Sequence, residues 1–275
     1  MDAKFEGLKD ILGESGGVLV AFSGGVDSTF LLKAAHMVLG DRAIAVTASS
    51  PTAPPGELEA AEKLARAIGC QHITLASHEL DNPSFAQNPV NRCYFCKDEL
   101  YRICRLRADQ MGLRSVVDGT NLDDLKDHRP GLKAAKEWGI RHPLVEARMT
   151  KEDIRYYSRK LNLPTWDKPA IACLSSRIPY GIEINVERLE KIAACELFLR
   201  ELRFREFRVR YHGDLARIEV APEEIARLLD TPTREAVVQK FKEVGFTFVS
   251  VDLQGYRTGS MNETLGNKSI SARVP

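Results

Sequence analysis

The stretch Ser23-Gly24-Gly25-Val26-Asp27-Ser28 lies between a short apolar run, Gly17–Ala21, and an amphipathic segment, Ser28–Leu39. The apolar run is typical of a buried parallel strand, and the segment that follows repeats its apolar residues at helical spacing. Glycines let the loop between them turn tightly and point its N–H groups inward, and the helix adds its positive N-terminal end. The stretch therefore predicts a strand, a phosphate-binding loop and a helix in succession.

Polar side chains in this loop extend the prediction to ATP. Ser23 and Ser28 can donate hydrogen bonds to phosphate beside the N–H groups of Gly24 and Gly25. Asp27 cannot attract phosphate directly, so we assign it to Mg²⁺, which bridges phosphate oxygens. Walker and dinucleotide-binding loops fit less well, because Gly-Lys-Ser/Thr and Gly-x-Gly-x-x-Gly are absent from this stretch. The alternative is a glycine-rich turn that only joins a strand to a helix.

Strands and helices alternate after the loop. We expect strands at residues 43–48, 72–76 and 115–118, helices at 56–68, 98–111 and 151–161, and a loop at 81–91. This alternation predicts an α/β fold, a parallel twisted sheet with helices on both faces. Ligands of such sheets bind at the carboxyl ends of the strands. Gly119 and Asn121, which follow the fourth strand, are therefore predicted to contact ATP.

The pattern changes after Gly181, where helices are expected at 186–202, 223–229 and 234–244 and strands at 207–211, 216–220 and 246–253. We predict a nucleotide-binding domain over residues 1–180 and a smaller C-terminal α+β domain over 181–275. Arg208 and Arg210 alternate on one strand, so both point to one face, where they can bind phosphate or carboxylate. The alternative for these two arginines is a solvated strand face. Arg177, which follows Cys173, could also reach a phosphate, and its alternative is structural ion pairing.

Charge and composition narrow the class of protein. The chain has 39 basic and 38 acidic residues, which argues against a general nucleic-acid coat or a binder of anionic membranes. We find neither an apolar run of about 18 residues nor the apolar core of a signal peptide, so we expect a cytoplasmic protein without a membrane partner. In that compartment the six cysteines are expected to be thiols, ligands or catalysts.

The loop Ser23–Ser28 resembles the PP-loop of the N-type ATP pyrophosphatases, which adenylate a substrate and release pyrophosphate. Together with residues 118–133, 172–181 and 207–219, it makes the chain similar to the LarE family over nearly its whole length. The resemblance implies an adenine nucleotide alpha-hydrolase-like fold and an oligomer. It also implies that ATP adenylates the carboxylates of pyridinium-3,5-biscarboxylic acid mononucleotide and that sulfur displaces AMP, in the biosynthesis of the nickel-pincer nucleotide cofactor. Substrate contacts are assigned to Arg129, Arg177, Arg208, Arg210 and Glu219.

The cysteines distinguish two branches of that family. In one branch a cysteine gives up its own sulfur, and its position aligns with Ala172, which has none to give. In the other, three cysteines hold a [4Fe-4S] cluster, and Cys93, Cys96 and Cys173 match that arrangement. Three thiolates leave one iron open, which can present sulfide to the acyl-adenylate. The resemblance thus implies a sulfide donor of unknown identity.

Other assignments remain open for these residues. Zinc, with His128 or Cys104 as a fourth ligand, and three unligated thiols both compete with the cluster. Cys70, Cys104 and Cys195 fit core positions. For the whole protein, a cluster-dependent tRNA thiolation enzyme of the PP-loop class is the main alternative, although the near-neutral charge counts against it. An amidotransferase-type synthetase and a non-enzymatic nucleotide-binding module are the others.

Overall fold

The computed structural model describes residues 2–126, 130–169, 172–257 and 259–260. The chain forms two compact units, and each is considered by itself. The first comprises the described residues of Met1–Phe85 and Pro89–Ile171, and the second those of Ala86–Asn88 and Ala172–Pro275. The division therefore falls before Ala172, whereas the sequence suggested a boundary after residue 180. The residues in between group with the second unit because Arg177 pairs with Glu196 there.

A four-stranded parallel sheet forms the centre of the first unit, in the order β3-β2-β1-β4. Its strands are β1 (Val18–Ala21), β2 (Ala43–Ser49), β3 (Gln71–Ala76) and β4 (Ser115–Asp118). Each lies within one or two residues of the range expected from its apolar run. The prediction of a parallel sheet is thus confirmed.

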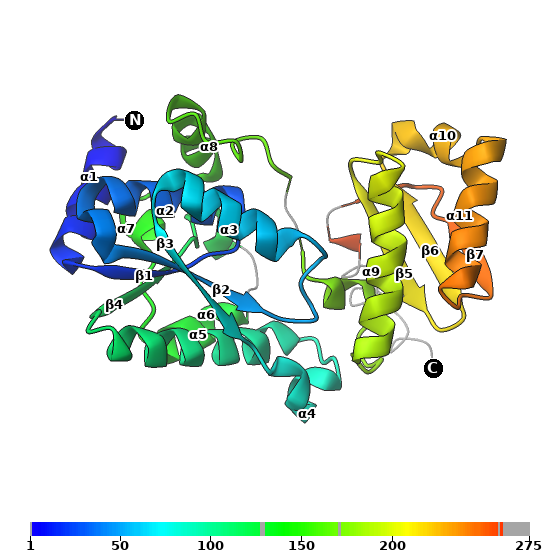
Figure 1. Cartoon of the computed structure of the whole chain (residues 1–275), viewed down its shortest axis with the longest axis horizontal. Helices are drawn as coiled ribbons and strands as arrows, with labels where there is room; N and C mark the ends of the chain where they lie inside the picture. Colours follow the sequence, from blue (N-terminus) through cyan, green and yellow to red (C-terminus); the bar gives the residue numbers. More distant parts are fainter. Residues whose placement is uncertain (1, 127–129, 170–171, 258, 261–275) are drawn as a thin grey trace, which may run out of the picture. The chain divides into compact units, whose positions relative to one another are not determined.

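Helices cover both faces of this sheet (Figure 1). The α-helices are α1 (Asp2–Ser15), α2 (Val26–Leu39), α3 (Glu57–Ile68), α4 (Pro83–Ala86), α5 (Arg92–Gln110), α6 (Gly131–Glu137), α7 (Pro143–Glu146) and α8 (Lys151–Lys160), with short 3₁₀ turns at Gly40–Arg42, Glu79–Asp81 and Asp123–Lys126. Alternate residues of each strand enter different cores: Val18 and Val20 pack with α1, α2 and α8, whereas Leu19 packs with α5 and α6. A strand buried on both faces explains the continuous apolar runs in the sequence.

Two helices depart from the expected ranges. Helix α5 begins at Arg92, six residues before the expected start, so Cys93 and Cys96 lie in its first turns rather than in a loop. Two prolines nearby, Pro83 and Pro89, favoured the prediction of a loop. Helix α1 was not predicted from the charged N-terminal sequence. Its buried side is formed by Leu8 and Leu12.

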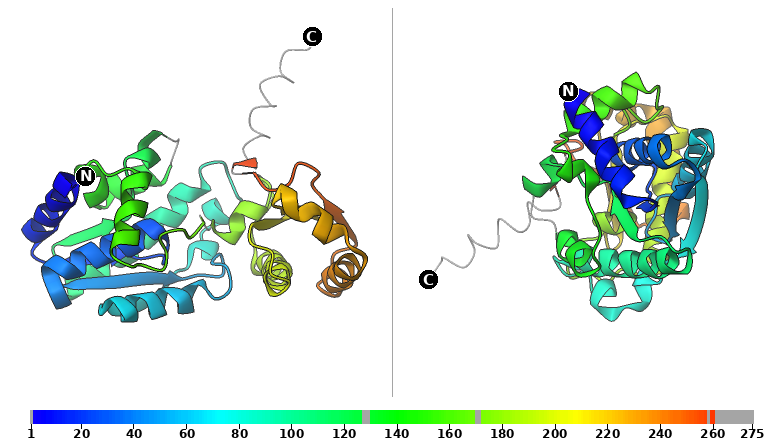
Figure 2. Two further views of the ribbon diagram at one scale, coloured as in Figure 1. Left: turned by 90° about the horizontal axis from the view of Figure 1, so that it is seen from above. Right: turned by 90° about the vertical axis from the view of Figure 1, so that its left-hand side faces the viewer.

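The second unit contains a three-stranded sheet in the order β5-β6-β7. Strands β5 (Phe207–His212) and β6 (Leu215–Val220) are antiparallel, and β7 (Phe248–Val251) runs parallel to β6. The helices are α9 (Val186–Glu201), α10 (Ile225–Leu229) and α11 (Thr231–Glu243), with 3₁₀ turns at Leu174–Arg177 and Pro222–Glu224. Helices α9 and α11 lie on the same side of this sheet (Figure 2). They contribute Leu199 and Phe241 to one core. The predicted smaller α+β domain is therefore present.

None of the helices described here is both long and apolar enough to cross a membrane.

Candidate active site

The loop Ser23–Ser28 connects the carboxyl end of β1 to the first turn of α2. Gly24 has a φ of +67°, and a Cβ at this position would lie 3.3 Å from the Cα of Ala61 on α3. A left-handed backbone and this close approach both require glycine. The hydroxyls of Ser23 and Ser28 are 3.1 Å apart, and the Gly25 N–H donates to Ser23 Oγ at 3.3 Å. Hydroxyl groups and helical N–H groups are thus gathered at one helix N-terminus.

The loop after β4 lies directly against this helix N-terminus. A Cβ on Gly119 would lie 2.9 Å from the backbone nitrogen of Ser28, so the close contact of the two loops depends on glycine. Asn121 is buried, and its amide donates to Asp27 Oδ1 at 3.3 Å. The structure therefore brings together the residues assigned to ATP from the sequence, namely Ser23, Gly24, Gly25, Asp27, Ser28, Gly119 and Asn121. Their contact with ATP itself stays a prediction.

Two lysines reach the same loop and were not found from the sequence. Lys151, the first residue of α8, forms an ion pair with Asp27. Lys168 donates to the carbonyl of Gly24 at 3.3 Å and pairs with Glu57 at 2.9 Å. No local pattern marks either residue, because each reaches the loop only through the fold. The start of α8, which places Lys151, is fixed by a capping box between Thr150 and Asp153.

A buried network links helix α5 to the end of β4. Asp118 accepts hydrogen bonds from Tyr101 Oη at 2.5 Å and from the Thr120 N–H at 3.0 Å, and its other partner is His142 Nδ1 at 2.7 Å. Burial alone would raise the pKa of Asp118, but the hydrogen bond with His142 and the charge of Lys97 hold that pKa well below its ordinary value. Asp118 therefore stays ionised and fixes the helix that carries Cys93 and Cys96.

The six cysteines, all of them thiols, divide by exposure. Burial raises the pKa of Cys70 to about 11 and the pKa values of Cys104 and Cys195 to about 12, as expected for core positions. Cys93 and Cys173 are exposed and Cys96 is partly exposed. The first two positions of the trio, 93 and 96, belong to the first unit and position 173 to the second. Within the described ranges no group of three or more His, Cys, Asp or Glu residues is arranged to hold a metal ion.

Arg177 lies at the end of the short turn that follows Cys173. Its side chain is 2% exposed and forms a bidentate pair with Glu196, with both N–O distances at 2.8 Å. Arg177 Nη1 also donates to the carbonyls of Ala172 and Cys173, at 2.8 and 2.9 Å. The structural pairing considered from the sequence is thus present, and it holds the backbone that carries Cys173. A contact between Arg177 and the substrate stays a prediction.

Arg208 and Arg210 lie on the face of β5 opposite Phe207 and Val209, as the alternation predicted. Arg210 forms a bidentate pair with the fully buried Glu219, at 3.0 and 2.7 Å.

Arg208 stacks on Tyr256 at 4.9 Å, and its pKa is lowered by burial and then by the charge of Arg177. A contact between Arg208 and the substrate stays a prediction. Arg129, the remaining predicted substrate residue, lies outside the described residues, as do Asp127 and His128.

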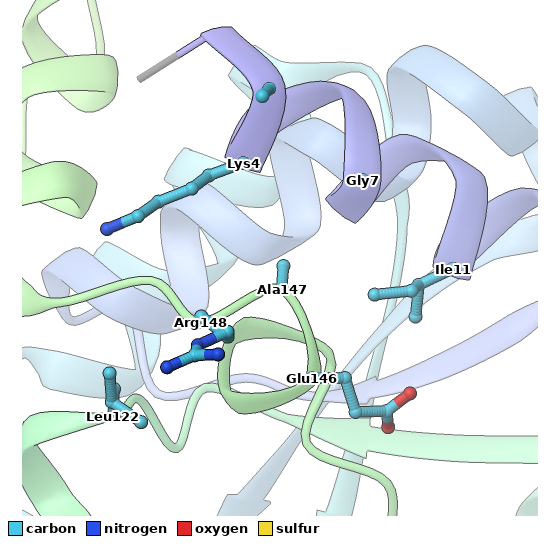
Figure 3. A pocket seen from close by; sticks show the side chains of 8 residues that line it. Lys4, Gly7, Ile11, Leu122, Glu146, Ala147 and Arg148 are labelled. Atoms are coloured by element: carbon cyan, nitrogen blue, oxygen red, sulfur yellow. The ribbon is translucent and has the colours of Figure 1, made fainter.

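A shallow cavity of about 500 Å³ lies elsewhere in the first unit, between α1 and the segment after α7. Lys4, Gly7 and Ile11 of the helix face Leu122 and residues 146–148 across it (Figure 3). Lys4 already pairs with Asp153 at 2.5 Å and Glu146 with Arg141 at 2.5 Å. The cavity includes none of the residues predicted to bind ATP or substrate.

Similarity to known proteins agrees with this arrangement. No protein-family profile matches the chain. An uncharacterised protein of Synechocystis is 46% identical over 96% of this chain and 99% of its own length. The pyridinium-3,5-bisthiocarboxylic acid mononucleotide synthase of Lactiplantibacillus plantarum is 38% identical over 92% of each chain. This chain belongs to the LarE family.

A more distant relative of this LarE protein extends the comparison to the wider class of fold. One of the subunits of the glutamine-hydrolysing GMP synthase of Archaeoglobus fulgidus is 25% identical over 63% of this chain and 58% of its own length. The parallel sheet, the glycine loop at its carboxyl edge and this relative together agree with the PP-loop class for the LarE chain.

Proposed function

We propose that this protein is an ATP-dependent sulfur transferase acting on pyridinium-3,5-biscarboxylic acid mononucleotide. ATP would convert a substrate carboxylate into an acyl-adenylate with release of pyrophosphate. Sulfide would then attack the acyl carbon and expel AMP, leaving a thiocarboxylate. A second round gives the dithio product used for the nickel-pincer cofactor.

The match to the Lactiplantibacillus synthase carries this proposal, because it extends over nearly the whole of both chains. The arrangement around Ser23–Ser28 supports the ATP half-reaction. Two hydroxyls, the N-terminus of α2 and the ammonium groups of Lys151 and Lys168 surround one loop. Such groups stabilise charge that develops on phosphates during adenylation. The carboxylate of Asp27 lies beside the loop. It could therefore provide one ligand to a Mg²⁺ ion whose other ligands are waters and phosphate oxygens.

We further propose that Cys93, Cys96 and Cys173 hold a [4Fe-4S] cluster that supplies the sulfur. Their surface position fits this role, since thiolates at the surface are available to iron and the three buried thiols resist ionisation. When bound by three thiolates, such a cluster keeps one iron free to carry sulfide. Arg177 would hold Cys173 in place. Asp118 would hold helix α5, which carries Cys93 and Cys96.

We assign substrate binding and assembly into a homo-oligomer to the second unit. Arg208 lies on one face of β5, on the same side as the buried ion pair between Arg210 and Glu219. Guanidinium groups in such an arrangement bind phosphate and carboxylate, which the proposed substrate contains.

The decisive experiment uses protein purified without oxygen. The protein is incubated with Mg-ATP, sulfide and the pyridinium mononucleotide, and AMP, pyrophosphate and thiocarboxylate are measured by chromatography and mass spectrometry. All three products should depend on the mononucleotide. Sulfur transfer to unmodified tRNA, tested in parallel, would instead establish the tRNA thiolation enzyme.

Iron analysis tests the cluster separately. About four irons per chain are expected in the same preparation. Single replacement of Cys93, Cys96 or Cys173 by Ala should remove the iron, whereas Cys195→Ala should retain it. An iron-free protein that still transfers sulfur would contradict the cluster proposal and leave the sulfur transferase proposal in place.

A further inference from the structure

Two segments of the first unit, the start of α8 and the loop after β4, meet at the carboxylate of Asp27 on α2. Lys151 begins helix α8, and its backbone N–H donates to Asp123 Oδ2 at 2.9 Å. The loop that contains Asp123 is in turn held to α2 by Asn121, which donates to Asp27. Lys151 is therefore placed against the phosphate loop by backbone contacts as well as by its own charge.

Both oxygens of Asp27 have partners in this arrangement. Oδ2 pairs with the ammonium of Lys151, and Oδ1 accepts from Asn121. The side chains of Asp27 and Lys151 are 23% and 37% exposed. Ion pairs that are this open to water are weak, worth about 0–1 kcal/mol, so either partner can be exchanged at low cost.

The charges at this loop conflict once Mg²⁺ and ATP are both considered. The assignment of Mg²⁺ to Asp27 places a divalent cation where the ammonium of Lys151 lies now. Two cations on one carboxylate repel each other, and the closest new anion would be the phosphate chain at the N-terminus of α2. A lysine has a long flexible stem with three donors and can make that change without movement of α8.

We propose that Lys151 is a nucleotide-binding residue that exchanges partners. Without ligand its ammonium neutralises Asp27. With Mg-ATP bound, Asp27 would hold Mg²⁺ and the ammonium of Lys151 would pair with a phosphate of ATP. This inference rests on the proposed function, and it gives Lys151 opposite effects on two ligands: it competes with the metal and assists the nucleotide.

The test compares Lys151→Met with Lys160→Met, which removes the same charge from the other end of α8, where Lys160 lies near the exposed Asp2. Binding of α,β-methylene-ATP with saturating Mg²⁺ is measured by calorimetry. Binding of Mn²⁺ to nucleotide-free protein is measured by electron paramagnetic resonance. For Lys151→Met we expect about tenfold weaker binding of the analogue. We also expect Mn²⁺ to bind about threefold more tightly, because its competitor is gone.

Further variants assign each result. Lys160→Met should match the wild type in both measurements, and Asp27→Asn should abolish the tighter Mn²⁺ binding of Lys151→Met. Lys151→Arg keeps the charge and should bind the analogue within about threefold of the wild type, which separates loss of charge from misfolding.

Unchanged analogue binding by Lys151→Met would overturn the nucleotide role. Unchanged Mn²⁺ binding would overturn the exchange. Failure of the wild type to bind the analogue would instead overturn the proposed function.

Discussion

Single residues hold the surface cysteine of the second unit in place. Arg177 and Glu196 are both almost fully buried, and Glu196 Oε1 also accepts from the Val209 N–H at 3.0 Å. The carbonyls of Ala172 and Cys173 are thereby tied to strand β5 through one ion pair. Arg177 is therefore a positioning residue, and its effect on chemistry would pass through Cys173.

Replacing one partner of this pair should be costly. Arg177→Met leaves the carboxylate of Glu196 buried without its cation, and we expect a loss of about 3–5 kcal/mol in the free energy of unfolding. The double variant Arg177→Met/Glu196→Met should recover part of that loss. Urea unfolding followed by circular dichroism measures both. A single variant as stable as the wild type would contradict the assigned role.

Exposed thiols should react faster than buried ones. Iodoacetamide at neutral pH should label Cys93 and Cys173 in the folded, iron-free protein, because these thiols are exposed. Cys70, Cys104 and Cys195 should react only after addition of urea, because burial raises their pKa values to about 11 or 12. Peptide mass spectrometry identifies the sites. Early labelling of Cys104 would show that helix α5 is not packed as described.

The elements of the first unit depend on close contacts between loops. Gly119→Ala would place a methyl group 2.9 Å from the Ser28 nitrogen, so one of the two loops must shift. We expect a loss of about 1–3 kcal/mol in stability together with weaker ATP binding.

Gly7→Ala is the matched control, because a Cβ there meets no atom within 4 Å in helix α1. This change should raise stability by up to about 1 kcal/mol. Thermal melts and calorimetry with an ATP analogue compare the two variants. Normal nucleotide binding by Gly119→Ala would show that this contact does not shape the site.

The same elements show what the sequence can and cannot reveal. The strands were predictable because burial on both faces makes each a continuous apolar run, and the positions of Gly119 and Asn121 followed from the sheet edge. The start of α5 was missed because Pro83 and Pro89 favoured a loop, and in the structure Asn91 forms no side-chain cap there. Lys151 and Lys168 were missed because their partners in the loop are far away in sequence, and no neighbouring residue indicates such a contact.

Across the whole molecule, histidine burial should make stability depend on pH. His72 lies in β3, with Nε2 2.8 Å from Thr47 Oγ1, and its pKa is lowered by burial. Its folded-state pKa lies below the unfolded value of 6.5, so the unfolded chain binds the proton more readily. The stabilising contribution is complete above the unfolded pKa and is lost as the pH falls through the window below it.

The free energy of unfolding should therefore fall as the pH is lowered below the unfolded value of 6.5, and less so in His72→Gln. The pKa of His212 is lowered by partial desolvation and by the charges of Arg217 and Arg210, and because this side chain is exposed it should contribute less than His72. His212→Gln therefore serves as the parallel variant. Equal pH dependence in the wild type and the double variant would contradict this origin.

The second unit also depends on three residues from the middle of the first. Asn88 is fully buried, and its amide donates to the carbonyls of Ile178, Pro179 and Ile182 at 3.2, 2.8 and 3.0 Å. Asn88→Ala should cost about 3 kcal/mol, because buried carbonyls lose their donor. Asn88→Gly, which suits the φ of 54° better, separates that loss from backbone strain. Urea unfolding measures both, and a neutral Asn88→Gly would contradict the role of the amide.

The segment Ala86–Asn88 determines what a single cut of the chain between the two units would produce. The chain passes from one unit to the other three times, after residues 85, 88 and 171. A protease that cuts once between Lys168 and Ala172 therefore yields two fragments that stay together under native conditions, since the larger one still supplies Ala86–Asn88 to the smaller. The halves of this protein are thus not interchangeable modules joined by a linker, and a gene split at that point should restore a working protein only when both pieces are made in the same cell.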